Sequence, residues 1–269
     1  MAAPGRGARG AVALGLPHRR MDSKPRRRAT ACASDLPIAG ITALSTVDWP
    51  GKLVATVFVQ GCPWRCTYCH NREILDCNTA GEHRFSEVET LLARRSGLLD
   101  GVVFSGGEAT RTASVVPALA RVRQLGFSTG LHTAGAYRAT LRAALEHLDW
   151  VGFDVKGLPA HYPDVAQVGE AMGERAWQVL AEVLASGVET EVRLTTYPGA
   201  HRLDDIIAIA QRAFDLGAPR FALQQARGEG GRGIFLAEAD ASVTSGQAEF
   251  DRAAAALTQR WNHRVIIRK

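Results

Sequence analysis

Residues 61–71 read GCPWRCTYCHN and place three cysteines, Cys62, Cys66 and Cys69, within eight residues. Their spacing is C-x3-C-x2-C, whereas a structural zinc site usually takes four ligands supplied as two separated pairs. A cubane [4Fe–4S] cluster has four irons, normally one for each thiolate, so three thiolates leave one iron open to a substrate. The loop therefore favours an iron–sulfur cluster over zinc.

The pattern around this loop predicts an α/β fold. From about residue 38 onward, short apolar runs alternate with longer amphipathic ones, which is typical of βα units and a mainly parallel sheet. Six pairs are fewer than a closed eight-fold barrel needs, so we expect an incomplete barrel or a doubly wound open sheet. The six predicted strands are residues 53–60, 101–106, 128–133, 150–156, 189–196 and 220–225.

Helices are expected between these strands, with capping residues at their starts and glycines at their ends. We predict a capping box of Ser86 and Glu89 ahead of residues 88–95, helices 112–125 and 171–186 ending at Gly126 and Gly187, and a final helix near 244–260.

Polar or glycine-rich sequence follows every predicted strand. Ligands collect at the carboxyl ends of parallel strands in both architectures, so these loops are expected to share one rim. In chain order they are the three-cysteine loop, GGEAT, HTAG, DVKG, TTYPG and QQARGEGG.

The segment CPWRCTYCHN (62–71) resembles the signature of radical S-adenosylmethionine (SAM) enzymes. Its Arg before the second cysteine and its YCHN ending most closely resemble the glycyl-radical-enzyme activating proteins. The lead-in GITALSTVDWPGKLVATVFVQGC (40–62) is similar to that of the anaerobic ribonucleoside-triphosphate reductase activating proteins. The resemblance covers roughly residues 38–227.

This resemblance implies an incomplete (β/α)6 TIM-like radical SAM barrel with two cofactors, a [4Fe–4S] cluster and SAM. Cys62, Cys66 and Cys69 would be the catalytic cluster ligands. We expect His70 and Cys77 not to bind the cluster, because a fourth ligand would compete with SAM for the open iron. The expected SAM contacts are Tyr68, Asn71, Gly106, Gly107, Glu108, Thr133, Asp154, Lys156, Arg193 and Gln224.

Two of these assignments also have plainer interpretations. Residues 105–108 (SGGE) resemble the family motif that contacts the methionine amino group, but could be a strand-to-helix turn, and Ala109 stands where the family has Pro. Asp154 and Lys156 share one face of a strand and could form an internal ion pair.

The HTAG segment departs from the family's DTNG. Thr133 matches its ribose-contacting residue, whereas His132 and Ala134 replace Asp and Asn, and His132 could be a core histidine. Arg193 and Gln224 could line the same cavity as the other expected contacts. Residues 228–233 satisfy G-x-G-x-x-G but follow the last predicted strand, so we interpret them as a loop and not as a dinucleotide site.

Charge divides the chain into two parts. Residues 1–34 carry eight Lys or Arg and one acid, Asp22, and the remainder carries 24 basic and 26 acidic residues. We predict a disordered basic tail over residues 1–36, with Met21 as an alternative start, and a radical SAM partial-barrel domain over residues 37–269. The body gives no reason to expect nucleic-acid binding, and no apolar run approaches the ~18 residues of a membrane span, so we expect a cytoplasmic protein.

The resulting prediction is a radical SAM activating enzyme. It would cleave SAM reductively and generate a glycyl radical on a partner enzyme, foremost the large subunit of an anaerobic ribonucleoside-triphosphate reductase. A flavodoxin- or ferredoxin-type protein would supply the electron. The alternatives are a radical SAM enzyme acting on a small molecule or nucleotide precursor, and a non-catalytic metal-binding module.

Overall fold

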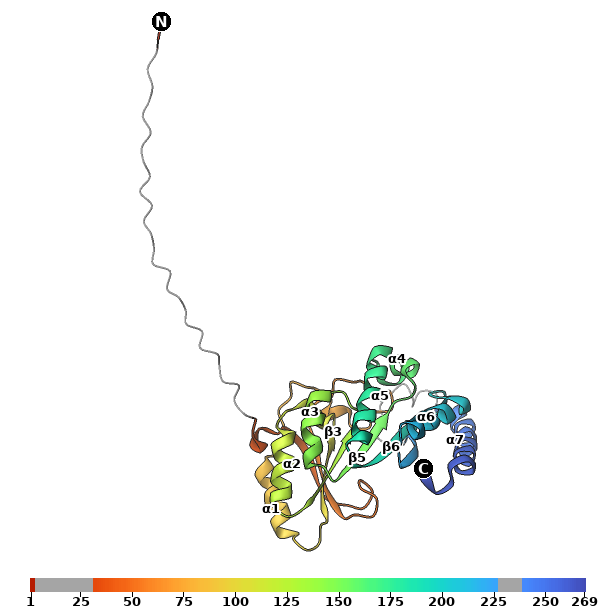
Figure 1. Cartoon of the computed structure of the whole chain (residues 1–269), viewed down its shortest axis with the longest axis horizontal. Helices are drawn as coiled ribbons and strands as arrows, with labels where there is room; N and C mark the ends of the chain where they lie inside the picture. Colours follow the sequence, from red (N-terminus) through yellow and green to blue (C-terminus); the bar gives the residue numbers. More distant parts are fainter. Residues whose placement is uncertain (3–30, 227–238) are drawn as a thin grey trace. The chain divides into compact units, whose positions relative to one another are not determined.

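The computed structural model describes residues 1–2, 31–226 and 239–269 (Figure 1). Most of the predicted basic tail and all of the 228–233 loop lie outside these residues. Within the described segments, no helix is both long and apolar enough to cross a membrane.

A single eight-stranded sheet contains the six predicted strands and two more at its edges. The strands follow one another in chain order from β1 to β8. This order excludes a doubly wound sheet, in which the strand order reverses at a switch point. The strands are β1 Ile38–Ser45, β2 Val54–Val59, β3 Gly101–Gly106, β4 Ser128–Thr133, β5 Trp150–Val155, β6 Glu189–Thr196, β7 Arg220–Gln225 and β8 Val265–Arg268.

The sheet forms an incomplete barrel, as predicted. β1 pairs with β2 in the antiparallel direction, and all other neighbouring strands are parallel. The sequence of β2, VATVFV, is rich in β-branched residues, and the strand is buried along nearly its whole length, which is typical of strands in the interior of a mainly parallel sheet. Among the described strands, β1 and β8 have one neighbour each and do not pair together, so the barrel is open between them.

Helices surround the strands, and Figure 1 shows them following the sheet in chain order from α1 to α7. The predicted helix ends at Gly126 and Gly187 are confirmed, and both glycines have a positive φ, 88° and 81°. Helices α3, α4 and α6 were not predicted. The helices are α1 Phe85–Arg94, α2 Val115–Gln124, α3 Arg138–Ala144, α4 Tyr162–Ala166, α5 Glu170–Ala185, α6 Leu203–Asp215 and α7 Ala239–Trp261.

The predicted capping box of Ser86 and Glu89 is wrong. Helix α1 begins at Phe85, one residue before the predicted cap. The carboxylate of Glu87 accepts a hydrogen bond from the backbone N–H of Arg84 at 2.8 Å, so it satisfies a donor just before the first turn.

Of the three apolar clusters in the described residues, two stabilise the barrel itself, and the third, around Trp64 and Tyr162, lies at the cysteine loop. The larger cluster packs the outward side chains of the strands against the helices. The smaller one consists of Trp49, Val54, Val103 and Trp150, with the rings of Trp49 and Trp150 stacked at 5.4 Å. Trp150 begins β5 and Val54 begins β2, so this cluster fills the amino-terminal end of the barrel and leaves the opposite end to polar side chains.

Candidate active site

The three-cysteine loop is held against helix α4. The indole of Trp64, only 3% exposed, contacts the ring of Tyr162 edge-on at 5.8 Å. The backbone N–H of Arg65 donates to the carbonyl of Ala166 at 3.2 Å, and that of Thr67 donates to a neighbouring α4 carbonyl at 3.0 Å. These contacts fix the loop although it lacks regular secondary structure.

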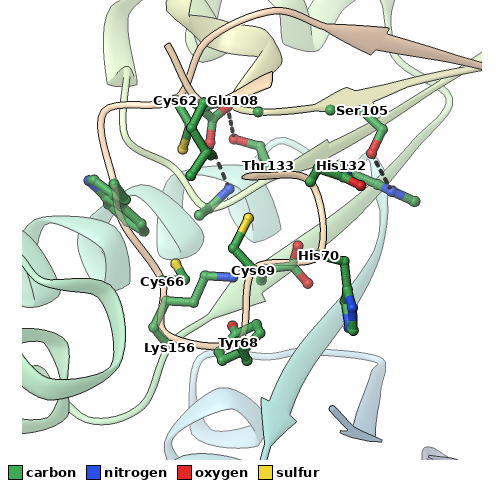
Figure 2. Close-up of a pocket in the computed structure, with 17 residues that line it drawn as sticks. Cys62, Cys66, Tyr68, Cys69, His70, Ser105, Glu108, His132, Thr133 and Lys156 are labelled. Atoms are coloured by element: carbon green, nitrogen blue, oxygen red, sulfur yellow. Dashed lines mark hydrogen bonds between the residues drawn. The ribbon is translucent and has the colours of Figure 1, made fainter. Parts of the chain in front are cut away.

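Cys62, Cys66 and Cys69 line one cavity of about 230 Å³ (Figure 2). None of them is in a disulfide. Among the described residues, no three His, Cys, Asp or Glu side chains converge closely enough to hold a single metal ion. Three free thiols from one loop line one cavity, which fits a multi-iron cluster in which each thiolate binds a different iron.

Cys77 lies beside the loop without lining this cavity. Its thiol is 3.5 Å from the carbonyl oxygen of Cys62, in hydrogen-bond contact for a sulfur donor. His70 does line the cavity. The expectation that neither residue binds the cluster stays a prediction.

The glycines after β3 allow two loops to touch. Gly106 has φ of 113°, a conformation that disfavours any other residue, and a Cβ on Gly107 would collide with the carbonyl oxygen of Gly61. The backbone N–H of Glu108 donates to that same carbonyl at 2.9 Å. The two glycines therefore bring the end of β3 against the backbone of the cysteine loop.

Glu108 joins the ends of β3 and β4. Its carboxylate is 3% exposed and accepts hydrogen bonds from the Thr110 backbone and hydroxyl, from the Thr133 hydroxyl at 2.7 Å, and from the Ala134 N–H at 2.9 Å. The Thr133 hydroxyl thus already donates its proton to Glu108. Both residues line the cysteine cavity, and their acidic and hydroxyl oxygens are held in fixed positions.

Asp154 pairs with Arg193 and not with Lys156, so the plainer interpretation of the DVK segment is wrong in its choice of partner. The Arg193 guanidinium donates to both carboxylate oxygens, at 2.9 and 3.1 Å. Burial alone would raise the pKa of Asp154, but the positive charges of Arg193 and Lys156 outweigh it and lower that pKa. Asp154 is therefore held as a carboxylate.

Lys156 lies over the ring of Tyr68, with its Nζ 5.2 Å from the ring centre. Burial acts to lower the pKa of Lys156, but the neighbouring Tyr68, Cys66 and Asp154 side chains outweigh burial and raise it well above its ordinary value. A charged ammonium group therefore lies among the cavity-lining side chains, close to the cysteine loop.

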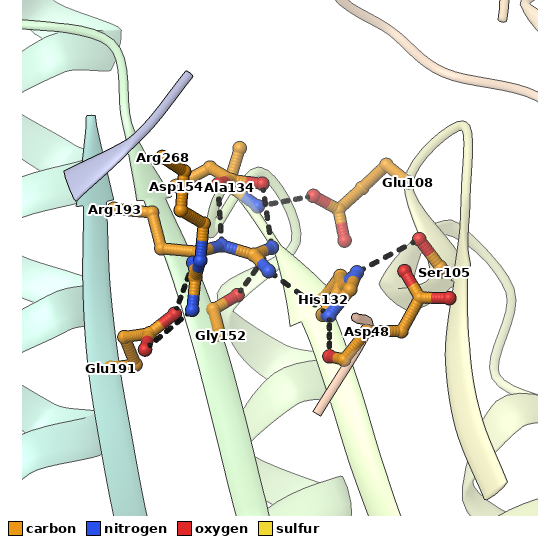
Figure 3. A network of polar contacts seen from close by, with 10 residues as sticks. All are labelled: Asp48, Ser105, Glu108, His132, Ala134, Gly152, Asp154, Glu191, Arg193 and Arg268. Atoms are coloured by element: carbon orange, nitrogen blue, oxygen red, sulfur yellow. Dashed lines mark hydrogen bonds and ion pairs between the residues drawn. The ribbon is translucent and has the colours of Figure 1, made fainter. Parts of the chain in front are cut away.

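His132 connects the cavity wall to the base of the barrel (Figure 3). Its Nδ1 is 3.1 Å from the Ser105 hydroxyl, and its Nε2 is 2.7 Å from the Asp48 carbonyl and 3.0 Å from Arg193. Burial, followed by the charge of Arg193, lowers the pKa of His132 to about 4, so the ring is neutral at pH 7. With its proton on Nε2, the ring donates to the Asp48 carbonyl and Nδ1 accepts from the Ser105 hydroxyl. The Arg193 contact at Nε2 is then a close approach of two donors and not a hydrogen bond.

Eight of the ten expected SAM contacts line the cysteine cavity, and Arg193 and Gln224 do not. These two line an adjoining cavity of about 300 Å³, named here the polar cavity. Four residues line both cavities, namely Tyr68, His132, Asp154 and Lys156. The eight residues in the cysteine cavity are Tyr68, Asn71, Gly106, Gly107, Glu108, Thr133, Asp154 and Lys156.

Two contacts of the site were not predicted from the sequence, an ion pair and an aromatic anchor. Arg268 on β8 donates to both oxygens of the buried Glu191 on β6, at 2.7 and 2.9 Å. A buried acid within a parallel strand is a signal that could have found it, because such a charge needs a partner. The Trp64 and Tyr162 contact carries no such signal, since the two residues are far apart in sequence.

Comparison with known proteins identifies the family. Residues 56–217 match the model described as the Radical SAM superfamily. A protein of Methanocaldococcus jannaschii named as a glycyl-radical enzyme activating enzyme is 29% identical, over 70% of this chain and 79% of its own length. Pyruvate formate-lyase 1-activating enzyme of Escherichia coli is 31% identical, over 62% of this chain and 73% of its own length.

A solved structure supports the fold. SuiB from Streptococcus suis bound to SAM superposes with a TM-score of 0.60 at 13% identity, covering 78% of this chain but 48% of SuiB. The chain thus spans about half the length of SuiB. The [4Fe–4S] cluster and SAM are the cofactors of the superfamily whose model the chain matches. The chain belongs to the radical SAM superfamily and, within it, to the glycyl-radical-enzyme activating enzymes.

Proposed function

We propose that this protein generates a glycyl radical on a partner enzyme, foremost the large subunit of an anaerobic ribonucleoside-triphosphate reductase. The observation that carries the proposal is a cavity lined by three free thiols in a chain related to glycyl-radical-enzyme activating enzymes. The lead-in over residues 40–62 supports the reductase as partner. The E. coli relative is named for pyruvate formate-lyase, which makes that enzyme the second candidate partner.

The cavity residues divide into two groups in this proposal. Cys62, Cys66 and Cys69 would hold the cluster, while Lys156 and the carboxylates of Asp154 and Glu108 would bind and orient SAM. When bound, the two cofactors supply one electron and the 5′-deoxyadenosyl group that takes a hydrogen atom from the glycine Cα. The chain's own contribution is to hold its charged groups in fixed positions around the cavity, chiefly through the Asp154–Arg193 and Glu108–Thr133 contacts.

The electron donor and the location belong to the same proposal. A flavodoxin- or ferredoxin-type protein would reduce the cluster from outside the cavity. The five cysteines are all free, which suits a reducing compartment such as the cytoplasm.

Anaerobic reconstitution tests the proposal. The protein is loaded with iron and sulfide, then mixed with dithionite, SAM and either the reductase large subunit or pyruvate formate-lyase from the same genome. We expect an electron paramagnetic resonance signal of a glycyl radical on the reductase, with release of 5′-deoxyadenosine.

Two variants control the experiment, and each outcome bears on one interpretation. Cys69→Ala should abolish both products, whereas Cys77→Ala should retain the cluster and both products. A glycyl radical on pyruvate formate-lyase alone would correct the partner. Release of 5′-deoxyadenosine without a radical on either protein would favour the small-molecule alternative, and no release at all would favour the non-catalytic module.

A further inference from the structure

The polar cavity opens toward the gap in the barrel. Its wall includes Val47, which follows β1, and Arg268 on β8, the two strands that bound the gap. Val47 is 71% exposed. A polypeptide segment approaching the gap would therefore meet this cavity beside the cysteine cavity.

The charges around the polar cavity compensate one another. Arg193 is paired with Asp154, and Arg268 is paired with Glu191. The remaining charged side chains of the wall are Asp48 and Lys156, which have opposite signs. A charged ligand would gain no net attraction here and would lose its hydration, so the cavity suits a neutral polar ligand.

Gln224 provides a free acceptor in this wall. It lies on β7 between Thr195 of β6 and Arg268 of β8, and all three side chains face the cavity. Its Oε1 is buried and has no hydrogen-bond partner among the described residues. A buried acceptor without a partner is costly, and a neutral N–H group from a ligand would satisfy it.

We propose that Gln224 binds the main chain of the partner's glycine segment, by accepting a hydrogen bond from one peptide N–H at its side-chain Oε1. This inference rests on the proposed function, which supplies a polypeptide as substrate. A peptide group is neutral, carries an N–H donor and is presented by every sequence, so it fits both the compensated charge and the free acceptor. Gln224 is thereby assigned to the partner rather than to SAM.

Ester substitution tests this contact directly. A labelled peptide spanning the reductase's glycine segment is made with each amide in turn replaced by an ester, which removes one N–H donor. Binding to the reconstituted protein with SAM is measured by fluorescence anisotropy, without turnover. We expect one ester position to weaken binding to the wild type by roughly two- to twelve-fold, the range for one neutral hydrogen bond.

Variants at Gln224 locate the acceptor. Gln224→Leu should bind the all-amide peptide roughly two- to twelve-fold more weakly than the wild type does. The ester at the position that weakens binding to the wild type should not weaken binding to this variant any further, because the acceptor of that N–H is gone. Gln224→Glu retains an acceptor and should keep the ester effect. The matched control is Gln225→Leu, since Gln225 on the same strand bonds Gln247 instead of lining the cavity. In Gln225→Leu, the ester should weaken peptide binding by the same factor as in the wild type.

Two results would overturn the inference, and they are distinguishable. If the wild type binds the peptide but Gln224→Leu keeps the full ester effect, Gln224 is not the acceptor and the proposed function stands. If the wild type binds no form of the peptide while binding SAM normally by calorimetry, the inference and the reductase as partner both fail.

Discussion

Removing the guanidinium of Arg193 should leave Asp154 as a largely buried carboxylate without its ion-pair partner. The Asp154 side chain is 27% exposed and that of Arg193 is 9% exposed, so water cannot fully replace the lost partner. Arg193→Met keeps much of the apolar stem while removing all donors. Breaking a buried ion pair from one side costs about 3–5 kcal/mol. We expect a loss of about 3 kcal/mol, at the low end of this range, because Lys156 still offsets part of the charge.

The same substitution should change the titration of His132. The charge of Arg193 is the second cause, after burial, that lowers the pKa of His132 to about 4. Without that charge, the pKa of His132 should rise, while burial keeps it below the ordinary value. The stability loss and the pKa rise have one origin and should occur together.

Urea unfolding of the full reduced chain measures the first effect, and an NMR titration of the imidazole signals measures the second. The double variant Asp154→Asn/Arg193→Met should be more stable than Arg193→Met alone, because a neutral amide leaves no buried charge. A loss below about 1 kcal/mol together with an unchanged His132 titration would show that Arg193 neither stabilises the buried Asp154 carboxylate nor lowers the pKa of His132. A double variant that is no more stable than the single one would show that the buried Asp154 charge does not cause the loss.

Three further outcomes follow from the contacts around the site. Trp64→Ala should lower the free energy of unfolding by about 3–5 kcal/mol, measured by urea unfolding, because the indole packs on Tyr162. The same variant should incorporate less iron, measured by an iron assay, because this packing holds the cysteine loop. Gly107→Ala should reduce iron incorporation while a surface Gly169→Ala, which has open space around its Cα, does not; equal iron contents would contradict the clash with Gly61. His201 is buried behind Lys156, with its Nε2 3.0 Å from the Lys156 carbonyl oxygen and its Nδ1 3.0 Å from the Thr196 hydroxyl. Burial lowers the pKa of His201 to about 4, so the unfolded chain binds the extra proton as pH falls from about 6.5 toward 4, and stability should decrease by up to about 3 kcal/mol. His201→Gln should flatten this part of the pH dependence of urea unfolding.

The parallel core of the fold could be predicted from the sequence, and its edges could not. Strands β2 to β7 are buried apolar runs that end at polar loops, and this pattern indicates both their limits and their common rim. β1 was missed because its middle residues are partly or fully exposed and its pairing with β2 is irregular. β8 was missed because it has four residues and follows a long helix.

The site was predictable where local spacing determines it. Cys62, Cys66 and Cys69 lie on one short loop, so their spacing indicates that their thiols lie close together, and contacts of the loop with α4 hold it at the cavity. The partner of Asp154 could not be inferred in this way, because Arg193 is 39 residues away and meets it only through the register of β5 and β6. Which cavity Gln224 lines likewise depends on β8, a strand that the sequence did not reveal.

The origin of the hydrogen atom in 5′-deoxyadenosine shows whether this protein takes it from a glycine Cα of the reductase. The reductase large subunit is produced with glycine deuterated at Cα and incubated anaerobically with the reconstituted protein, dithionite and SAM. We expect the 5′-deoxyadenosine formed with this partner to gain one deuterium by mass spectrometry, and that formed with unlabelled partner to gain none. Product without deuterium, formed at the same rate with and without the labelled partner, would contradict this expectation.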